Sequence, residues 1–296
     1  MDSNSIPDAE ILAKAVAASL ELGKPIGRKW LKESFNIGTH RAERVLAIVR
    51  AISLANASVE IPQSAGPDWA TYPQIPLPAL IISDLHIPYQ DSEWLERVVS
   101  YAALSGIRRC VVAGDLLDAE KLSVFVTPPG ESFEQSLEPT RKIIQWLEGF
   151  FPEVHIFPGN HDFRFSKKLD RQMSVAYLIR LLAGERTQVY EHHHAFLGDT
   201  WLVAHPRGYS RIPTKPALEL TSKFGKNVAI GHTHKLSLGT DPSGRHFAIE
   251  IGMCADARRI EYLHRELSTA PVPQLGALII DQNEDPLLLH PRMFPK

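Results

Sequence analysis

Apolar residues recur with the spacing of amphipathic helices over residues 8 to 54. The first predicted helix has Asp8 as a candidate N-cap and ends at Gly23. One of its faces consists of the apolar residues Ile11, Leu12, Ala15, Val16 and Leu20. A short helix over residues 28–35 follows, and Thr39 can cap a third helix with apolar positions Val45, Leu46, Ile48 and Val49. Helix, tight glycine turn and helix in this order predict a helix-turn-helix domain over residues 1–54.

The helical pattern stops between residues 55 and 78, where five prolines stand among Ser, Ala and Gly. This composition predicts a Pro-rich linker. Beyond it, five short apolar runs have the length of buried strands; they are residues 80–82, 110–113, 154–157, 201–204 and 228–230.

Helical patterns separate the first three of these runs, at residues 92–104 and 137–150, so this part is expected to form β-α-β units with a mainly parallel sheet. Three hairpins are expected later, over residues 194–205, 236–251 and 276–289. The predicted fold of residues 79–296 is therefore α/β, with two mixed β-sheets in a sandwich flanked by helices.

The composition is that of an ordinary globular protein and argues against several other classes, namely proteins that attract polyanions over their whole surface, disulfide-rich proteins and membrane-spanning proteins. The 296 residues are 44% hydrophobic with a formal net charge of -2, so any attraction to a polyanion must be local. Two cysteines without Cys-x-x-Cys spacing indicate neither a disulfide framework nor a thiolate zinc site. With a polar N-terminus and no apolar run of about 20 residues, a cytoplasmic protein without membrane contact is expected.

Polar segments follow each of the five predicted strands directly. They are Asp84-Leu85-His86, Gly114-Asp115-Leu116-Leu117-Asp118, Gly159-Asn160-His161-Asp162, His205, and Gly231-His232-Thr233-His234. Ligands of open α/β sheets bind at the carboxyl ends of strands, so these side chains are expected to converge. Each segment alone is weak evidence, but together they supply the mixed oxygen and nitrogen donors that favour Mn²⁺, with Fe or Zn²⁺ as alternatives, over Mg²⁺.

In this order the five segments resemble the calcineurin-like metallophosphoesterases, whose pattern is Asp-x-His, Gly-Asp-x-x-Asp, Gly-Asn-His-Asp/Glu, a lone His, and Gly-His-x-His. The resemblance implies two divalent metal ions and a water, activated between them, that hydrolyses a phosphoester. One metal would take Asp84, His86 and His234; the other would take Asn160, His205 and His232. Asp115 would bridge the two.

The same resemblance assigns roles off the metals. His161 would contact the phosphate or protonate the leaving oxygen, Asp162 would orient its imidazole, and Asp118 would hold the loop or a ligand histidine. Arg207, which follows His205 closely, is a candidate phosphate contact, whereas Phe163, Arg164 and Phe165 are either entrance residues or ordinary surface. Ala119 departs from the family, because many members carry Arg there. Three consecutive histidines, residues 192–194, could suggest a metal site. Since alternate side chains of an extended segment point in opposite directions, an exposed loop or strand edge is expected there instead.

The predicted helix-turn-helix carries a local excess of positive charge between residues 24 and 50. Residues 30–42 resemble the winged-helix tail of bacterial DNA translocases, which implies DNA contact through Lys29, Thr39, His40, Arg41 and Arg44. A helical bundle used for protein contacts is the alternative.

The leading functional hypothesis is a dinuclear-metal phosphodiesterase or nuclease acting on DNA. A phosphomonoesterase or phosphoprotein phosphatase is the first alternative, and a DNA-binding regulator with an inactive esterase domain is the second.

Overall fold

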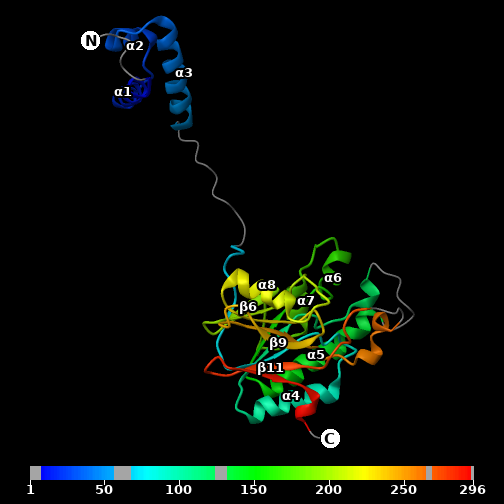
Figure 1. Cartoon of the computed structure of the whole chain (residues 1–296). Helices are drawn as coiled ribbons and strands as arrows, with labels where there is room; N and C mark the ends of the chain where they lie inside the picture. The colour runs from blue at the N-terminus through cyan, green and yellow to red at the C-terminus, as the bar shows by residue number, and fades with distance from the viewer. Residues whose placement is uncertain (1–7, 57–67, 124–131, 265–268, 295–296) are drawn as a thin grey trace. The chain divides into compact units, whose positions relative to one another are not determined.

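The structure is a computed structural model that describes residues 8–56, 68–123, 132–264 and 269–294. It divides into two compact units, Met1–Asp68 and Trp69–Lys296, which differ in architecture (Figure 1). Among the described residues, no helix combines the length and the apolar character that crossing a membrane requires.

The first unit contains three helices, α1 (Asp8–Glu21), α2 (Arg28–Phe35) and α3 (Thr39–Asn56). The predicted helix boundaries agree closely, and Asn36 ends α2 in the left-handed conformation at φ 50°. All three helices share one small core, formed by Ile11, Ala15, Ile26, Leu31, Ile37, Ala42, Val45, Leu46 and Val49.

Not every apolar position of these helices is buried. Ile48 is 46% exposed, because it lies outside the arc of the helical wheel that Ala42, Val45, Leu46 and Val49 occupy, and Leu20 is 69% exposed. The predicted bounds of the linker need a correction. The stretch predicted to be linker contains strand β1 (Gln74–Ile75), which pairs with a later strand; its residues 57–67 lie outside the described part of the chain. No strand is described between residues 8 and 56, so no wing accompanies these helices there.

The second unit contains two six-stranded sheets. Sheet I contains four parallel strands in the order β2 (Ala79–Ile82), β3 (Arg109–Ala113), β4 (Glu153–Phe157) and β5 (Thr187–Val189). On the other side of β2 lie β11 (Ala277–Ile280), antiparallel to β2, and then β12 (Pro286–Leu289), antiparallel to β11. In sheet II the order is β1, β6 (His194–Leu197), β7 (Trp201–Ala204), β8 (Asn227–Ile230), β10 (Phe247–Ile251) and β9 (Leu236–Thr240). Both sheets mix parallel and antiparallel pairs, as predicted.

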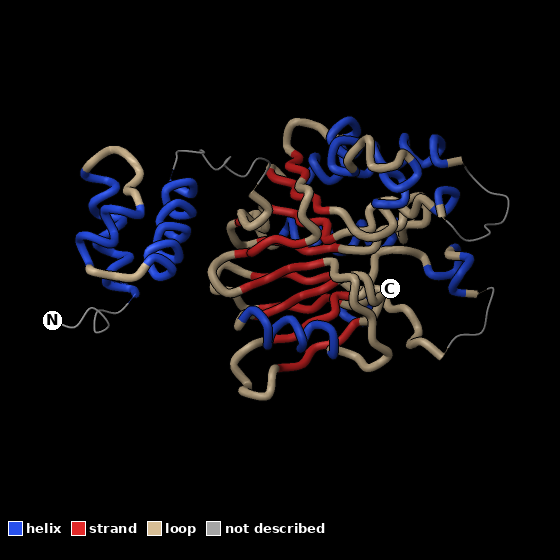
Figure 2. The backbone as a smooth tube through the Cα atoms, turned by 90° about the horizontal axis from the view of Figure 1, so that it is seen from above, coloured by secondary structure: helices blue, strands red, loops and turns tan. Residues whose placement is uncertain are grey.

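Alternation of side chains along the strands decides what each sheet face packs against. Ile81 and Val111 of sheet I meet Trp201 and Val203 of sheet II in the core between the sheets. The neighbouring residues of sheet I, such as Ile82, point the other way, against α4 (Ser92–Leu104), α5 (Phe133–Phe150) and α7 (Val175–Leu182). Sheet II is covered by α8 (Lys215–Phe224). Figure 1 shows α8 on one side of the strands and α4 and α5 on the other, and Figure 2 shows the strands side by side, seen from above. This arrangement is the predicted α/β sandwich.

Some elements carry no clear sequence signal. α5 begins four residues before the predicted start, because Ser132 and Gln135 form a capping box there. The short helix α6 (Phe163–Lys168) and the edge strand β5 were not predicted, and neither were the short 3-10 turns η1 (Glu120–Leu122), η2 (Ala257–Arg259), η3 (Glu261–Leu263) and η4 (Pro291–Met293).

Candidate metal centre

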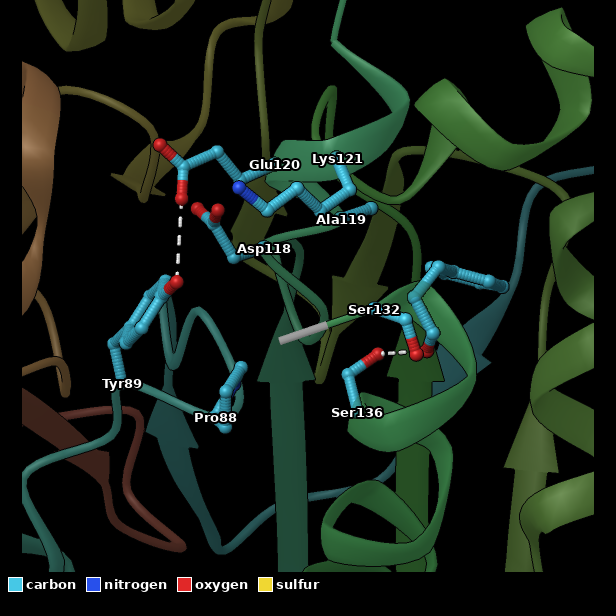
Figure 3. A pocket seen from close by; sticks show the side chains of 9 residues that line it. Pro88, Tyr89, Asp118, Ala119, Glu120, Lys121, Ser132 and Ser136 are labelled. Atoms are coloured by element: carbon cyan, nitrogen blue, oxygen red, sulfur yellow. Dashed lines mark hydrogen bonds between the residues drawn. The ribbon is translucent and has the colours of Figure 1, made fainter. Parts of the chain in front are cut away.

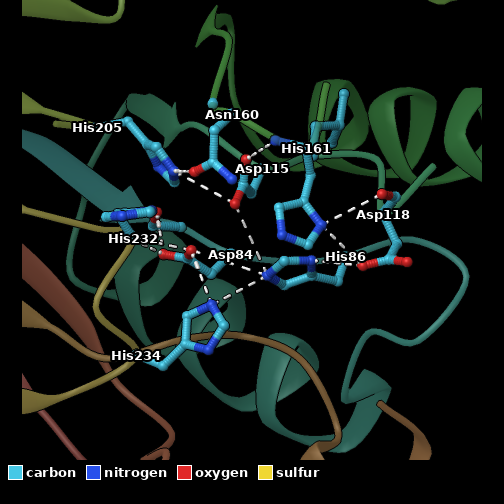
Figure 4. Close-up of polar contacts among 12 residues, drawn as sticks. Asp84, His86, Asp115, Asp118, Asn160, His161, His205, His232 and His234 are labelled. Carbon is cyan, nitrogen blue, oxygen red and sulfur yellow. Dashed lines mark hydrogen bonds and ion pairs between the residues drawn. The ribbon is translucent and has the colours of Figure 1, made fainter. Parts of the chain in front are cut away.

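The seven predicted metal ligands lie at the carboxyl ends of strands from both sheets. Sheet I supplies Asp84 and His86 after β2, Asp115 after β3 and Asn160 after β4; sheet II supplies His205 after β7 and both His232 and His234 after β8. Their side chains point toward one another (Figure 4). The convergence expected from the strand pattern is therefore present.

Five of these ligands have a left-handed backbone, with φ of 54° at Asp84, 48° at His86, 49° at Asp115, 74° at His232 and 57° at His234. Residues other than glycine adopt this conformation at a cost of about 1–3 kcal/mol each, and such strain collects at functional sites. Here it has a direct use, because each strand turns sharply at its end and aims a polar side chain back over the sheet edge.

Two motif glycines are required by close packing against ligands. A Cβ at Gly159 would collide with the Asp115 carboxylate and its backbone nitrogen. A Cβ at Gly231 would collide with the side chains of Ser83 and Asp84. Because these contacts join loops from different strands, the glycines let the ligand loops come close enough to form one site.

The first donor set consists of Asp84, His86 and His234. Asp84 Oδ1 lies 3.2 Å from His234 Nε2 and 3.8 Å from His86 Nε2, and the two imidazole nitrogens are 3.1 Å apart. The other carboxylate oxygen, Oδ2, accepts hydrogen bonds from Ser83 Oγ and from the backbone N–H of His232. The N–H of His232 also reaches Oδ1, at 3.2 Å, so both oxygens anchor the loop and Oδ1 in addition faces the two histidines.

The second donor set consists of Asp115, Asn160, His205 and His232. His205 Nε2 lies 3.1 Å from Asn160 Oδ1 and 3.3 Å from Asp115 Oδ2. The same Asp115 oxygen is 3.9 Å from His86 Nε2, in the first set. Asp115 thus stands between the two sets, which is the position that a bridging ligand needs.

The chemistry of these atoms fits a pair of divalent cations. Metal-binding atoms of Asp84, His86 and His234 lie within 4.8 Å of one another, and so do those of Asp115, His205 and His232. Burial alone lowers the pKa of His205, but the Asp115 carboxylate beside it raises this pKa to about 10. The buried carboxylates thus favour positive charge at this point, which divalent ions would supply on neutral histidine ligands.

His161 lies beside this centre but has partners of its own. Its Nδ1 is 3.0 Å from Asp118 Oδ1, and the same oxygen is 2.9 Å from Nδ1 of His86. Burial by itself raises the pKa of Asp118, but the hydrogen bonds from both histidines hold that pKa below its ordinary value. The ionised Asp118 therefore accepts a hydrogen bond from each Nδ1–H, so that both rings turn Nε2 toward the centre.

The role predicted for Asp162 requires a correction. Its carboxylate accepts hydrogen bonds from the backbone N–H groups of Gly159, Leu116 and Leu117, and His161 is not among its partners. Asp118 orients the imidazole instead. Asp162 fastens the loop after β4 to the loop after β3, so it holds the backbone that carries Asp115 and Asn160.

The remaining predicted positions lie at the margins of the centre. Arg207 is exposed in the loop after β7 and has no hydrogen bond to a predicted ligand among the described residues. Ala119, at φ 48°, borders a small hollow next to Asp118 (Figure 3), whose lining residues are Pro88, Tyr89, Asp118, Ala119, Glu120, Lys121, Ser132, Phe133 and Ser136.

The histidine triplet is half-buried instead of exposed. His193 stacks on Phe163 at a centroid separation of 4.5 Å, and His192 packs against Tyr72 and Trp69. None of the three belongs to a metal-binding group among the described residues. The triplet thus lies at the start of strand β6, packed against aromatic rings instead of exposed.

Tyr262 is a member of the site that the sequence did not indicate. It lies in η3, with its ring centroid 6.0 Å from that of His161. The residue is 40% exposed, yet desolvation on its inner side raises the pKa of Tyr262 well above its ordinary value, and the charges of Asp118 and Asp115 add to this effect. The phenol therefore stays neutral and keeps an O–H donor at the rim of the centre. No motif marks it, because it lies beyond the hairpin of β9 and β10, in a stretch of short 3-10 turns.

The candidate DNA-contact residues all lie in the helical unit. Lys29 and His40 are almost fully exposed, and Thr39 and Arg44 are also exposed. Arg41 differs, because its side chain is only 19% exposed and pairs with Asp8 at 2.7 Å.

No protein-family model matches the chain. Among curated proteins, it is 26% identical to the Gene 54 protein of Mycobacterium phage L5 over 209 residues, which cover 62% of this chain and 82% of that protein. The Gene 54 protein of Mycobacterium phage D29 is also 26% identical, over 210 residues and with the same coverage of both chains.

Solved structures with a similar fold include the YfcE phosphoesterase of E. coli, at 13% identity and a TM-score of 0.37, covering 72% of this chain and 98% of that one. They also include a single mutant of Vps29 from Entamoeba histolytica, at 16% identity, the same TM-score and the same coverage. Both structures share less than a fifth of their residues with this chain.

Proposed function

We propose that the chain is a metal-dependent hydrolase of phosphoesters. The observation that carries this proposal is the pair of donor sets that share Asp115, with His161 beside them and bound to Asp118 instead. Two metals on these ligands would neutralise the phosphoryl charge and activate water. A site built only to hold metal for stability would not need a separate imidazole facing its open side.

The protein's own residues have distinct tasks in this reaction. Asp118 fixes the His161 ring through Nδ1, which leaves Nε2 as the atom that can contact the phosphoryl group or the leaving oxygen. Asp162 keeps the loops after β3 and β4 in register. Hydrolysis breaks the bond between phosphorus and the leaving oxygen, adds OH from water to phosphorus, and delivers a proton to the leaving oxygen.

Turnover of simple aryl phosphates tests the reaction class. Protein stripped of metal and then given Mn²⁺ is expected to hydrolyse a bis-aryl phosphate faster than a mono-aryl phosphate, and the stripped protein is expected to be inactive. Preference for the monoester would favour the phosphomonoesterase or phosphoprotein phosphatase. Lack of turnover of either compound, with metal content measured as full, would favour a regulator with an inactive esterase unit.

DNA is the substrate that we propose within this class. Lys29 and Arg44 project from α2 and α3 with side chains 87% and 70% exposed, which suits contacts with backbone phosphates. Each also has an acidic neighbour within 4 Å, Glu33 and Asp8 respectively, so the surface is less basic than the count of cations suggests. A few phosphate contacts, and not broad electrostatic attraction, are therefore expected.

Salt dependence of DNA binding tests this second step. Replacing Lys29 and Arg44 together by Ala is expected to weaken binding and to lower the slope of log K against log salt by about 2, since two fewer counterions are released. Lys14→Ala, on the exposed side of α1, is the matched control. Cleavage of single-stranded, duplex and nicked DNA with Mn²⁺ identifies the substrate. An unchanged slope would exclude Lys29 and Arg44 as phosphate contacts. No cleavage of any DNA by protein that hydrolyses aryl phosphates would exclude DNA as the substrate.

A further inference from the structure

Arg164 places a guanidinium group directly on the candidate centre. It lies in the first turn of α6, three residues after His161, and its side chain is only 19% exposed. Nη2 lies 3.1 Å from His161 Nε2, and Nη1 donates to the backbone carbonyl of Asp118 at 2.9 Å. The cation therefore sits against the one atom of His161 that faces the centre.

Pairing with Asp118 does not account for this arrangement. The Asp118 carboxylate oxygen nearest to Arg164 is Oδ2, at 3.9 Å from Nη1, whereas Oδ1 is already shared by His86 and His161. Of the five N–H donors that a guanidinium carries, only two make hydrogen bonds to other described residues. A largely buried guanidinium with spare donors is suited to bind an oxyanion.

The position directly after Asp118 carries no charge, although Lys121 further along this loop also lines the hollow. Ala119 follows Asp118 and is only 5% exposed, at the edge of the hollow in Figure 3, where its methyl group leaves space. Arg164 reaches the backbone of this loop from α6. It thus brings positive charge to a position that residue 119 cannot serve.

We propose that Arg164 binds the phosphoryl oxygens of the substrate. When the guanidinium turns toward the phosphoryl group, it leaves His161 Nε2, which is then free to contact the same phosphoryl group. This inference rests on the proposed phosphoester hydrolysis and names the residue that recognises the phosphate. Two N–H groups of an arginine fit two phosphoryl oxygens side by side. The fork holds the phosphoryl group on the open side of the donor sets, against His161.

Phosphate binding measured by calorimetry tests the assignment separately from turnover. The variants are Arg164→Gln and Arg164→Lys, and Lys167→Gln, an exposed cation on the same helix, is the matched control. Each protein is loaded with Mn²⁺, its metal content is measured, and inorganic phosphate is titrated. Turnover of an aryl phosphate is then recorded on the same samples.

Arg164→Gln is expected to weaken phosphate binding by about 10- to 100-fold, the usual effect of losing hydrogen bonds from a charged donor. The phosphate affinity of Arg164→Lys should lie between those of the wild type and Arg164→Gln, because lysine keeps the charge but lacks the paired N–H donors of the guanidinium. Metal content should stay equal to that of the wild type and of Lys167→Gln. If Arg164 only oriented His161, turnover would fall while phosphate affinity stayed the same, and this result would overturn the proposal.

The two proposals fail in different ways. Wild-type protein that binds phosphate through Arg164 but hydrolyses no phosphoester would refute the hydrolase and leave the phosphate site in place. Wild-type protein that hydrolyses aryl phosphates, with phosphate affinity unchanged in Arg164→Gln, would refute the phosphate site alone. Wild-type protein with full metal content and no phosphate binding would refute Arg164 as a phosphate ligand outright.

Discussion

The metal centre and the helical unit use charged side chains in opposite ways. In the centre, Asp84, Asp115 and Asp118 are buried, and each is held by histidines or backbone N–H groups from other loops. In the helical unit, cations such as Lys29 stand in water, with acidic neighbours close by. Buried charges need a fixed partner, whereas exposed charges do not.

Because of this difference, the buried site is compatible with fewer functions than the exposed helical surface. A buried carboxylate cluster has few physical explanations, and metal ligation is the one that its histidines support. An exposed basic helix is compatible with DNA, a protein partner or plain solubility. Variants and conditions that act on one region only therefore test whether chemistry resides in the α/β unit alone.

Replacing the shared ligand should have the largest effect. Asp115→Asn removes the charge that stands between both donor sets, so turnover should fall on the order of 10³-fold or more and metal content should drop. Activity with Mn²⁺ and metal content by elemental analysis are the measurements. Asp170→Asn, at an exposed acidic position of the same unit, is the control.

His161→Ala sharpens the same experiment. Because the partners of His161 are Asp118 and Arg164, the variant should lose turnover while its metal content stays equal to that of the wild type. Loss of metal in this variant would mean that His161 is a ligand together with His86 and Asp115, whose binding atoms lie close to its own.

Metal removal should separate the stability of the two regions. At a metal concentration of about 100 times Kd, binding stabilises the folded state by about 2.7 kcal/mol. For a unit of this size, that corresponds to a Tm lower by roughly 5–10 °C after chelation. Calorimetry on the full chain should show the shift in the α/β transition only. A matching shift in the helical transition would mean that the two units unfold together.

The sequence predicted the ligand positions because strand ends fix them. Asp84, Asn160 and His205 each follow a buried run, and the turn after a strand leaves little freedom. The sequence could not predict which partner each remaining carboxylate takes. Asp118 contacts His161, whereas Asp162 accepts from the backbone N–H of Leu117, and the spacing of the two carboxylates in the sequence does not distinguish these partners.

Other residues were missed because their neighbours are distant in the chain. Tyr262 belongs to irregular 3-10 turns, where no periodicity indicates which side chain points inward. The pair between Arg41 and Asp8 spans 33 positions, so a count of charges between residues 24 and 50 could not reveal it. Arg164 was closer to being predictable, since positions three apart on a helical turn are neighbours.

A mutation in the core of the helical unit tests whether turnover depends on it. Leu31→Ala removes a fully buried side chain shared by the three helices and should cost about 2–5 kcal/mol, enough to unfold so small a unit. Hydrolysis of an aryl phosphate should stay within about twofold of the wild type, while DNA binding is lost. Ile48→Ala, at a 46% exposed position of α3, is the control. Loss of aryl phosphate turnover in Leu31→Ala would contradict the separation of the two regions.

The smallest effect concerns a buried histidine of the α/β unit away from the centre. Burial lowers the pKa of His155, on β4, where Nδ1 lies 2.9 Å from the Tyr190 hydroxyl. The unfolded chain, with the ordinary value near 6.5, then binds a proton that the folded chain resists, so stability falls as pH drops below about 6.5. A single proton accounts for at most about 1.4 kcal/mol per pH unit. His155→Gln should flatten this part of the stability curve, measured as urea midpoints at pH 7.5 and 5.5, whereas His40→Gln on the exposed helical surface should leave it unchanged. An equal slope in wild type and His155→Gln would mean that another group causes the acid sensitivity of the α/β unit.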